Sequence, residues 1–143
     1  MTILPVTLTF AAIAGLMNIW LGWRVGQVRM SEKVLTGDGG NMRVIARMRA
    51  QANFVEFTPF VLILMGAIEL AGGWPLALWA VGAVYFLARI AHAFGMESTD
   101  KPGRGRGPGI LVTMLVLLGL SGWALYTAYT VPHVSMAMVT RAA

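Results

Sequence analysis

The chain has 143 residues, of which 57% are hydrophobic and only 12% are charged, so it lacks the polar coat of a water-soluble domain, where about 25% are charged. Its net charge of +5 does not indicate nucleic-acid binding, because ten of the eleven Lys and Arg form two clusters between Arg24 and Arg106, a pattern typical of membrane topology. The absence of cysteine excludes disulfides, iron–sulfur clusters and thiolate zinc sites, so any thiol chemistry needs a thiol from a substrate.

The first 23 residues carry no charge, and the apolar run from Ile3 to Trp23 is long enough to cross a bilayer, which takes about 20 apolar residues. The basic start and small-residue cleavage site of a secretory signal are both missing. We therefore predict a retained first helix over residues 4–29. The following stretch, 29–41, is dense in Gly and Asp and is predicted to be a loop.

The rest of the chain repeats this pattern. A second helix is predicted over 42–70, with Pro59 inside it, and an uncharged turn at 72–75 leads to a third helix over 75–96. Residues 97–109 are so rich in Gly and Pro that we predict a loop, followed by a fourth helix over 110–131. The predicted fold is an all-α membrane protein, with a bundle of four transmembrane helices forming one domain over 1–143.

The distribution of positive charge predicts the orientation in the membrane. The N-terminus and the 72–75 turn have no Lys or Arg, and the C-terminal tail has only Arg141. The two polar loops and their flanks hold the others, including Lys101. Because positively charged loops stay in the cytoplasm, we predict cytoplasmic loops and periplasmic termini. The absence of a targeting segment favours a bacterial inner membrane.

Polar residues line one face of each of three predicted helices, although an ionisable side chain in the membrane costs about 2.5–3.5 kcal/mol on insertion scales. Spacings of i, i+4, i+7 and i+11 in two sets, and of i, i+4 and i+11 in the third, put the members of each set on one helical face. The sets are Arg49, Asn53, Glu56 and Phe60; Tyr85, Arg89, His92 and Met96; and Asn18, Gly22 and Arg29.

These faces have two interpretations. In the first, Arg49, Glu56 and Arg89 form a structural ion-pair network that holds the helices together. In the second, the three faces converge on a binding site near the cytoplasmic loops. For a site, guanidinium groups favour a ligand with carboxylates, and Asn53 and Glu56 suit an amide or an ammonium group. A metal is not expected, because His92 has no Cys, Asp or second His at ligand spacing.

Three segments of the sequence resemble one known family. The run Arg49-Ala-Gln-Ala-Asn53-Phe-Val-Glu56-Phe-Thr-Pro59-Phe is similar to the second-helix signature of the MAPEG family, the membrane-associated proteins in eicosanoid and glutathione metabolism. Gly26-Gln-Val-Arg29 and Arg89-Ile-Ala-His92 resemble family sequences at matching places on helices one and three. The resemblance covers nearly the whole chain.

The resemblance implies a homotrimer in which glutathione, the co-substrate, binds between neighbouring subunits at the cytoplasmic side. It implies a glutathione-dependent transferase or peroxidase acting on lipophilic electrophiles or lipid hydroperoxides. It also implies that an Arg at the start of helix four stabilises the glutathione thiolate; Arg104 and Arg106 are the candidates, and Arg106 is preferred because it lies nearer the helix. The implied glutathione-binding residues are Arg29, Arg49, Asn53, Glu56, Arg89 and His92.

Two positions depart from the family pattern. Met96 and Phe57 stand where family enzymes carry Tyr, and both changes remove a hydroxyl group that can bind glutathione. This leaves an alternative function open: a non-catalytic protein on the same fold, either a lipid-binding protein or an accessory subunit of a larger membrane complex.

Overall fold

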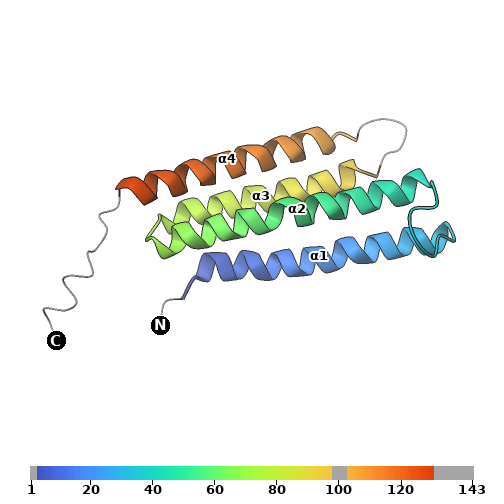
Figure 1. The fold of residues 1–143 in the computed structure, drawn as a ribbon, viewed down its shortest axis with the longest axis horizontal. Coiled ribbons are helices and arrows are strands. Elements are labelled where there is room, and N and C mark those ends of the chain that lie inside the picture. Colours follow the sequence, from blue (N-terminus) through green and yellow to red (C-terminus); the bar gives the residue numbers. More distant parts are fainter. Residues whose placement is uncertain (1–2, 98–102, 131–143) are drawn as a thin grey trace, which may run out of the picture.

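Four helices make up the bundle in the computed structural model, which describes residues 3–97 and 103–130 (Figure 1). Each is long and apolar enough to cross a membrane, and no strand is present in the described part of the chain. The predicted all-α, four-helix class is therefore confirmed. The helices are α1 Pro5–Ser31, α2 Met42–Leu70, α3 Pro75–Gly95 and α4 Arg106–Thr130.

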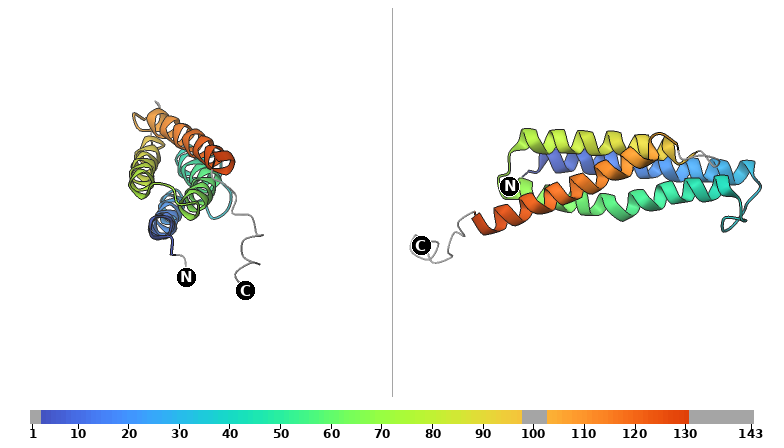
Figure 2. Two further views of the ribbon diagram at one scale, coloured as in Figure 1. Left: turned by 90° about the vertical axis from the view of Figure 1, so that its left-hand side faces the viewer. Right: turned by 90° about the horizontal axis from the view of Figure 1, so that it is seen from above.

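The helices alternate in direction, so α1 and α3 end, and α2 and α4 begin, at the same end of the bundle (Figures 1 and 2). We call this the loop end. The most extensive contacts are between α3 and α4 and between α1 and α2; of the helix pairs in contact, α1 and α3 touch least. Both predicted polar loops thus start from the loop end. That this end faces the cytoplasm stays a prediction. Lys101 and Arg141 lie outside the described residues.

Local sequence explains where the first three helices begin. Pro5 and Pro75 stand in the first turns of α1 and α3, where a missing backbone N–H costs nothing. The side chain of Asn41 caps α2 by accepting a hydrogen bond of 2.9 Å from the N–H of Arg43. The predicted bounds of α2 are confirmed, and α2 continues through Pro59.

A carboxylate from α2 ties the opposite end of the bundle together. Glu69 accepts hydrogen bonds from the backbone N–H groups of Val6 at 2.9 Å and Thr7 at 2.8 Å. These N–H groups belong to the first turn of α1 and have no partner within that helix. The start of α1 is therefore capped by the end of α2.

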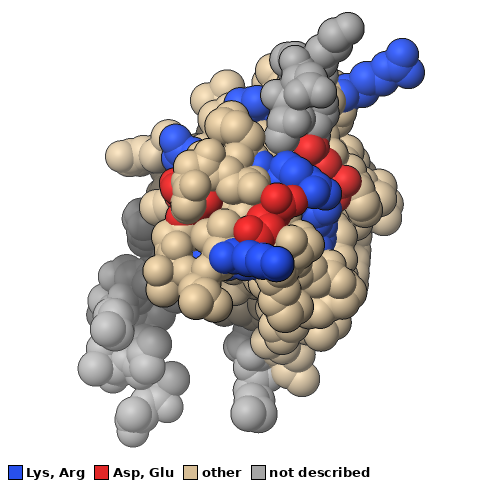
Figure 3. All heavy atoms as spheres, turned by 90° about the vertical axis from the view of Figure 1, so that its right-hand side faces the viewer, with Lys and Arg blue, Asp and Glu red and all other residues tan. Residues whose placement is uncertain are grey.

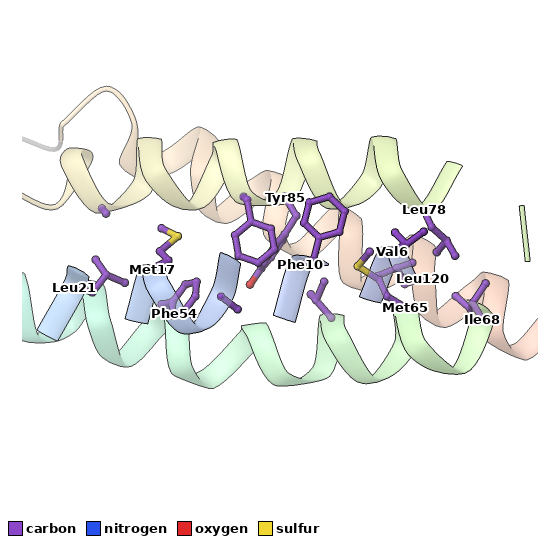
Figure 4. Close-up of a cluster of buried hydrophobic side chains, with 14 residues drawn as sticks. Val6, Phe10, Met17, Leu21, Phe54, Met65, Ile68, Leu78, Tyr85 and Leu120 are labelled. Carbon is purple, nitrogen blue, oxygen red and sulfur yellow. The ribbon is translucent and has the colours of Figure 1, made fainter. Parts of the chain in front are cut away.

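Aromatic packing fills the centre of the bundle (Figure 4). The rings of Phe10 and Phe86 stack with centroids 5.5 Å apart, and Tyr85 meets Phe86 edge-on at 5.2 Å. The Tyr85 hydroxyl lies 2.8 Å from that of Thr58, so its polar group is satisfied inside the core. Gly82 leaves room for the Phe10 ring, which a Cβ at that position would overlap.

The predicted start of the fourth helix was wrong. The helix α4 begins at Arg106, four residues before the predicted position, and includes Pro108 and Gly109 in its first turn. The first N–H groups of a helix have no intrahelical partner, so proline is tolerated there. Three glycines of this segment, Gly103, Gly105 and Gly109, lie in close contact with α3.

Glycines allow α4 to approach α3 closely, and we call the four involved the glycine seam: Gly95, Gly103, Gly105 and Gly109. A Cβ on Gly109 would lie 2.6 Å from the Cβ of His92 and 2.8 Å from the carbonyl oxygen of Ala88. A Cβ on Gly105 would overlap the carbonyl group of Ala91. Only glycine permits this approach, which brings Arg106 to the end of α3.

The glycine seam predicts different effects for two neighbouring substitutions. Gly109→Ala should lower the stability of the protein in detergent by about 1–3 kcal/mol, because the added methyl group overpacks the contact with α3. Gly107→Ala is the matched control, because a Cβ there meets nothing within 4 Å and alanine favours a helix. Thermal unfolding followed by circular dichroism measures both, and an unchanged midpoint for Gly109→Ala would contradict the seam.

Candidate functional site

A cleft of about 320 Å³ opens near the loop end between α2, α3 and α4. Charged side chains gather at this end of the molecule (Figure 3). The cleft takes polar residues from all three helices, and three apolar side chains, Ala52, Met96 and Ile110, complete it. The polar lining residues are Arg49, Asn53, Glu56, His92 and Arg106.

Helical spacing positions these side chains. Arg49, Asn53 and Glu56 follow each other at i, i+4 and i+7 and so share one face of α2 over about 10 Å. His92 stands in the last turn of α3, and Arg106 is the first residue of α4. The glycine seam brings these two helix ends together.

The structure thus brings together five of the eight residues expected at the site. It does not unite Arg29, Arg89 and Arg104 with them in the cleft lining. Arg104 is exposed, whereas Arg106, the preferred candidate, lines the cleft.

Arg89 lies inside the bundle and is only 1% exposed. Its guanidinium donates to the hydroxyl of Thr113 at 3.2 Å, and that hydroxyl donates to the carbonyl of Gly109 at 2.9 Å. Arg49, Glu56 and Arg89 form no ion pair with one another. The structural ion-pair network considered as an alternative is therefore absent among these three residues.

Arg29 lies away from the cleft. One of its terminal nitrogens donates to the sulfur of Met48 at 3.4 Å, and its side chain lines a separate hollow together with Lys33. Within one chain Arg29 therefore takes no part in the cleft. Its expected role in binding glutathione stays a prediction.

Two polar atoms of the cleft residues lack partners. The amide oxygen of Asn53 and the Nδ1 atom of His92 are buried and have no hydrogen-bond partner within the described part of the chain. Buried polar groups are nearly always hydrogen-bonded in folded proteins, so such atoms at a cleft are suited to a polar ligand. Arg49 and Glu56 are exposed and stand at the opening. The cleft fits a small, polar, anionic ligand.

A second charged cluster near the loop end was not found from the sequence. Glu97, just after α3, forms ion pairs with the buried Arg24 and, at 3.0 Å, with Arg47. The Arg24 guanidinium also lies over the rings of Trp20 at 4.6 Å and Phe94 at 4.9 Å. The spacing of Trp20 and Arg24, one helical turn apart on α1, was the sequence signal for this cluster. Its other members, Arg47, Phe94 and Glu97, are brought to Arg24 by tertiary packing.

Four apolar helices, three of which border a cleft with two arginines, define a small helical membrane protein. The chain belongs to the MAPEG family, whose family model matches residues 7–126. It is similar to inner membrane protein YecN of Escherichia coli strain K12, with 27% identity over 113 residues, covering 79% of this chain and 85% of that protein. The protein of the same name from Escherichia coli O6:H1 strain CFT073 matches with the same identity and coverage.

The ion pairs that Glu97 and Glu32 form near the loop end should contribute differently to the stability of the protein. Glu97→Gln should lower the unfolding free energy by roughly 1–3 kcal/mol, because it leaves the buried Arg24 without a carboxylate. Glu32→Gln removes an ion pair with Arg43, which is 67% exposed, and should cost less than about 1 kcal/mol. Equal unfolding midpoints of the two variants in detergent would show that the Glu97 cluster does not hold the helices.

Proposed function

We propose that this protein is a glutathione-dependent transferase or peroxidase of the inner membrane that acts on lipophilic electrophiles or lipid hydroperoxides. The proposal depends on one observation above all: Arg49 and Arg106 face a cleft whose Asn53 and His92 have unpartnered polar atoms. Family membership supports glutathione as the ligand, and the relative named an inner membrane protein supports the location.

The charges of the site and of glutathione are complementary. Arg49, Arg106 and the nearby buried Arg89 outweigh the single carboxylate of Glu56. Glutathione carries two carboxylates and one ammonium group, and its thiolate adds a further negative charge. Guanidinium groups bind carboxylates through paired hydrogen bonds, Glu56 suits the ammonium group, and Asn53 suits a peptide N–H.

Arg106 is placed to favour the thiolate. It is the first residue of α4, so its guanidinium and the positive end of the helix dipole both attract an anion. A thiol with a pKa of about 8.5 is mostly protonated at neutral pH, and a neighbouring positive charge lowers that pKa. Arg106 thus increases the fraction of the nucleophilic form.

The thiolate then has two possible acceptors. With an electrophilic carbon, a sulfur–carbon bond forms and the displaced group leaves with the electron pair. With a lipid hydroperoxide, the oxygen–oxygen bond breaks, and two glutathione molecules are oxidised to the disulfide while the hydroperoxide becomes an alcohol and water. The protein contributes binding and thiolate stabilisation in both reactions.

We also propose a homotrimer with its loop end in the cytoplasm. The cleft is open on the surface of one chain, because Arg49 and Glu56 are exposed. Arg29 lies outside the cleft of its own chain, so in a homotrimer it can approach the cleft of a neighbouring subunit. The cytoplasm is the side favoured by the positive charge of the loop end.

Met96 favours a second candidate function, a non-catalytic lipid-binding or accessory subunit. Its thioether lines the cleft where family enzymes offer a Tyr hydroxyl, so one hydrogen bond to the ligand is missing. The experiments below separate glutathione binding from turnover.

Glutathione binding tests the site itself. Arg49→Ala and Glu56→Ala should each weaken binding by about tenfold to a hundredfold, because each removes a charge-assisted hydrogen bond. Arg43→Ala is the control, since Arg43 lies on the same helix but pairs with Glu32 outside the cleft. Isothermal titration calorimetry of the lipid-embedded protein gives the affinities, and equal affinity in all variants would remove the site assignment.

Turnover tests the role of Arg106. Arg106→Ala should lower kcat with glutathione and 1-chloro-2,4-dinitrobenzene by about 10²–10³, a size typical of losing a group that stabilises developing or full negative charge. Arg104→Ala, in the exposed position two residues earlier, should leave kcat nearly unchanged. If the parent protein binds lipid but turns over neither this electrophile nor a lipid hydroperoxide, the non-catalytic function is correct.

A further inference from the structure

A second hollow runs between α1 and α3, on a side of the bundle away from the cleft. It has a volume of about 340 Å³, within the range of small-molecule pockets. Its floor is formed by the buried side chains Met17 and Phe86, and the partly exposed Ile13 and Ile90 stand at its walls. It lies between the two neighbouring helices that touch least. We call it the α1–α3 groove.

The groove runs along the helix axes. Ile13, Met17 and Trp20 follow at i, i+4 and i+7 on α1, while Phe86, Ile90 and Phe94 follow at i, i+4 and i+8 on α3. The span from Ile13 to Trp20 is about 10 Å, roughly a third of the hydrocarbon core of a bilayer. Its direction and length match part of an acyl chain in one leaflet.

The loop end of the groove is closed by aromatic rings and positive charge. The rings of Trp20 and Phe94 lie 5.7 Å apart, and the guanidinium of Arg24 covers both. Arg24 and Arg47 share the single carboxylate of Glu97, so this cluster carries one excess positive charge among the residues that the structure describes. Tryptophan and arginine near the ends of membrane helices are typical of the membrane interface, where lipid phosphates lie.

We infer that the α1–α3 groove is a phospholipid site: one acyl chain lies in the groove, and the phosphate of the same lipid lies against the Arg24–Arg47 pair. The inference does not depend on glutathione. Glu97 balances only one of the two arginines, and the phosphate supplies the second negative charge. Arg47, whose side chain is 26% exposed, is the more accessible of the two guanidinium groups.

The position of the groove argues against its use by the lipophilic substrate of the proposed reaction. On α3, the groove residues Phe86, Ile90 and Phe94 are turned by roughly 130° from the face of His92 and Met96. An electrophile in the groove would therefore be separated from Arg106 by the body of α3. The groove suits a bound membrane lipid better than a reacting molecule.

Native mass spectrometry of the full protein in detergent tests this site, with phosphatidylglycerol and phosphatidylcholine of identical acyl chains as probes. The parent protein should retain phosphatidylglycerol about fivefold more strongly, the preference expected of one excess positive charge. Ile13→Trp fills the groove and should lower retention of both lipids about tenfold or more. Ile19→Trp is the matched control, because Ile19 is 71% exposed on α1 and does not line the groove.

Two further variants complete the test. Ile90→Trp fills the groove from α3, so the result does not depend on the folding of one variant. Arg47→Gln removes the excess charge and should abolish the preference for phosphatidylglycerol while phosphatidylcholine stays bound. Equal retention by the parent, Ile13→Trp, Ile90→Trp and Ile19→Trp would overturn the site. A change of oligomeric state in the groove-filling variants with no change in bound lipid would assign the groove to a second copy of the chain.

Discussion

The close contact between α3 and the start of α4 determines the geometry of the candidate site. Because glycines occupy the contact, the backbone of α4 reaches the last turns of α3 without an intervening side chain. Arg106 therefore begins its helix beside His92, and the carbonyl of Gly109 receives the Thr113 hydroxyl that also binds Arg89. Widening this contact by one methyl group would displace the guanidinium of Arg106 and the hydrogen bonds beneath the cleft together.

The second constraint is electrostatic. A membrane bundle normally pairs or exposes its charges, and this one does so at Glu32 and at Glu97. The arginines in and below the cleft have no such carboxylate partner in the described residues, and Glu56 is not paired with them. A bundle that brings positive charges from three helices close together is stabilised by a ligand that neutralises them. This connects the fold to the proposed binding of glutathione.

Much of this arrangement was predictable from the sequence, because crossing a bilayer requires long apolar segments and polar faces at helical spacing. The bounds of α2 and the shared face of Arg49, Asn53 and Glu56 follow from these requirements. The start of α4 was not predictable, because glycine by itself favours a loop. The role of these glycines becomes visible only in their packing against α3. The Arg24–Glu97 contact likewise joins residues far apart in the chain, and no spacing within one helix predicts it.

The central claim is that the cleft between α2, α3 and α4 holds glutathione through groups that the protein leaves unpaired. A structure of the protein determined in lipid nanodiscs with glutathione tests it most directly. The account predicts density for the tripeptide within hydrogen-bond distance of Asn53 and His92, with its sulfur beside Arg106. A closed cleft in which Arg49 pairs with Glu56, with no ligand density between the helices, would contradict it.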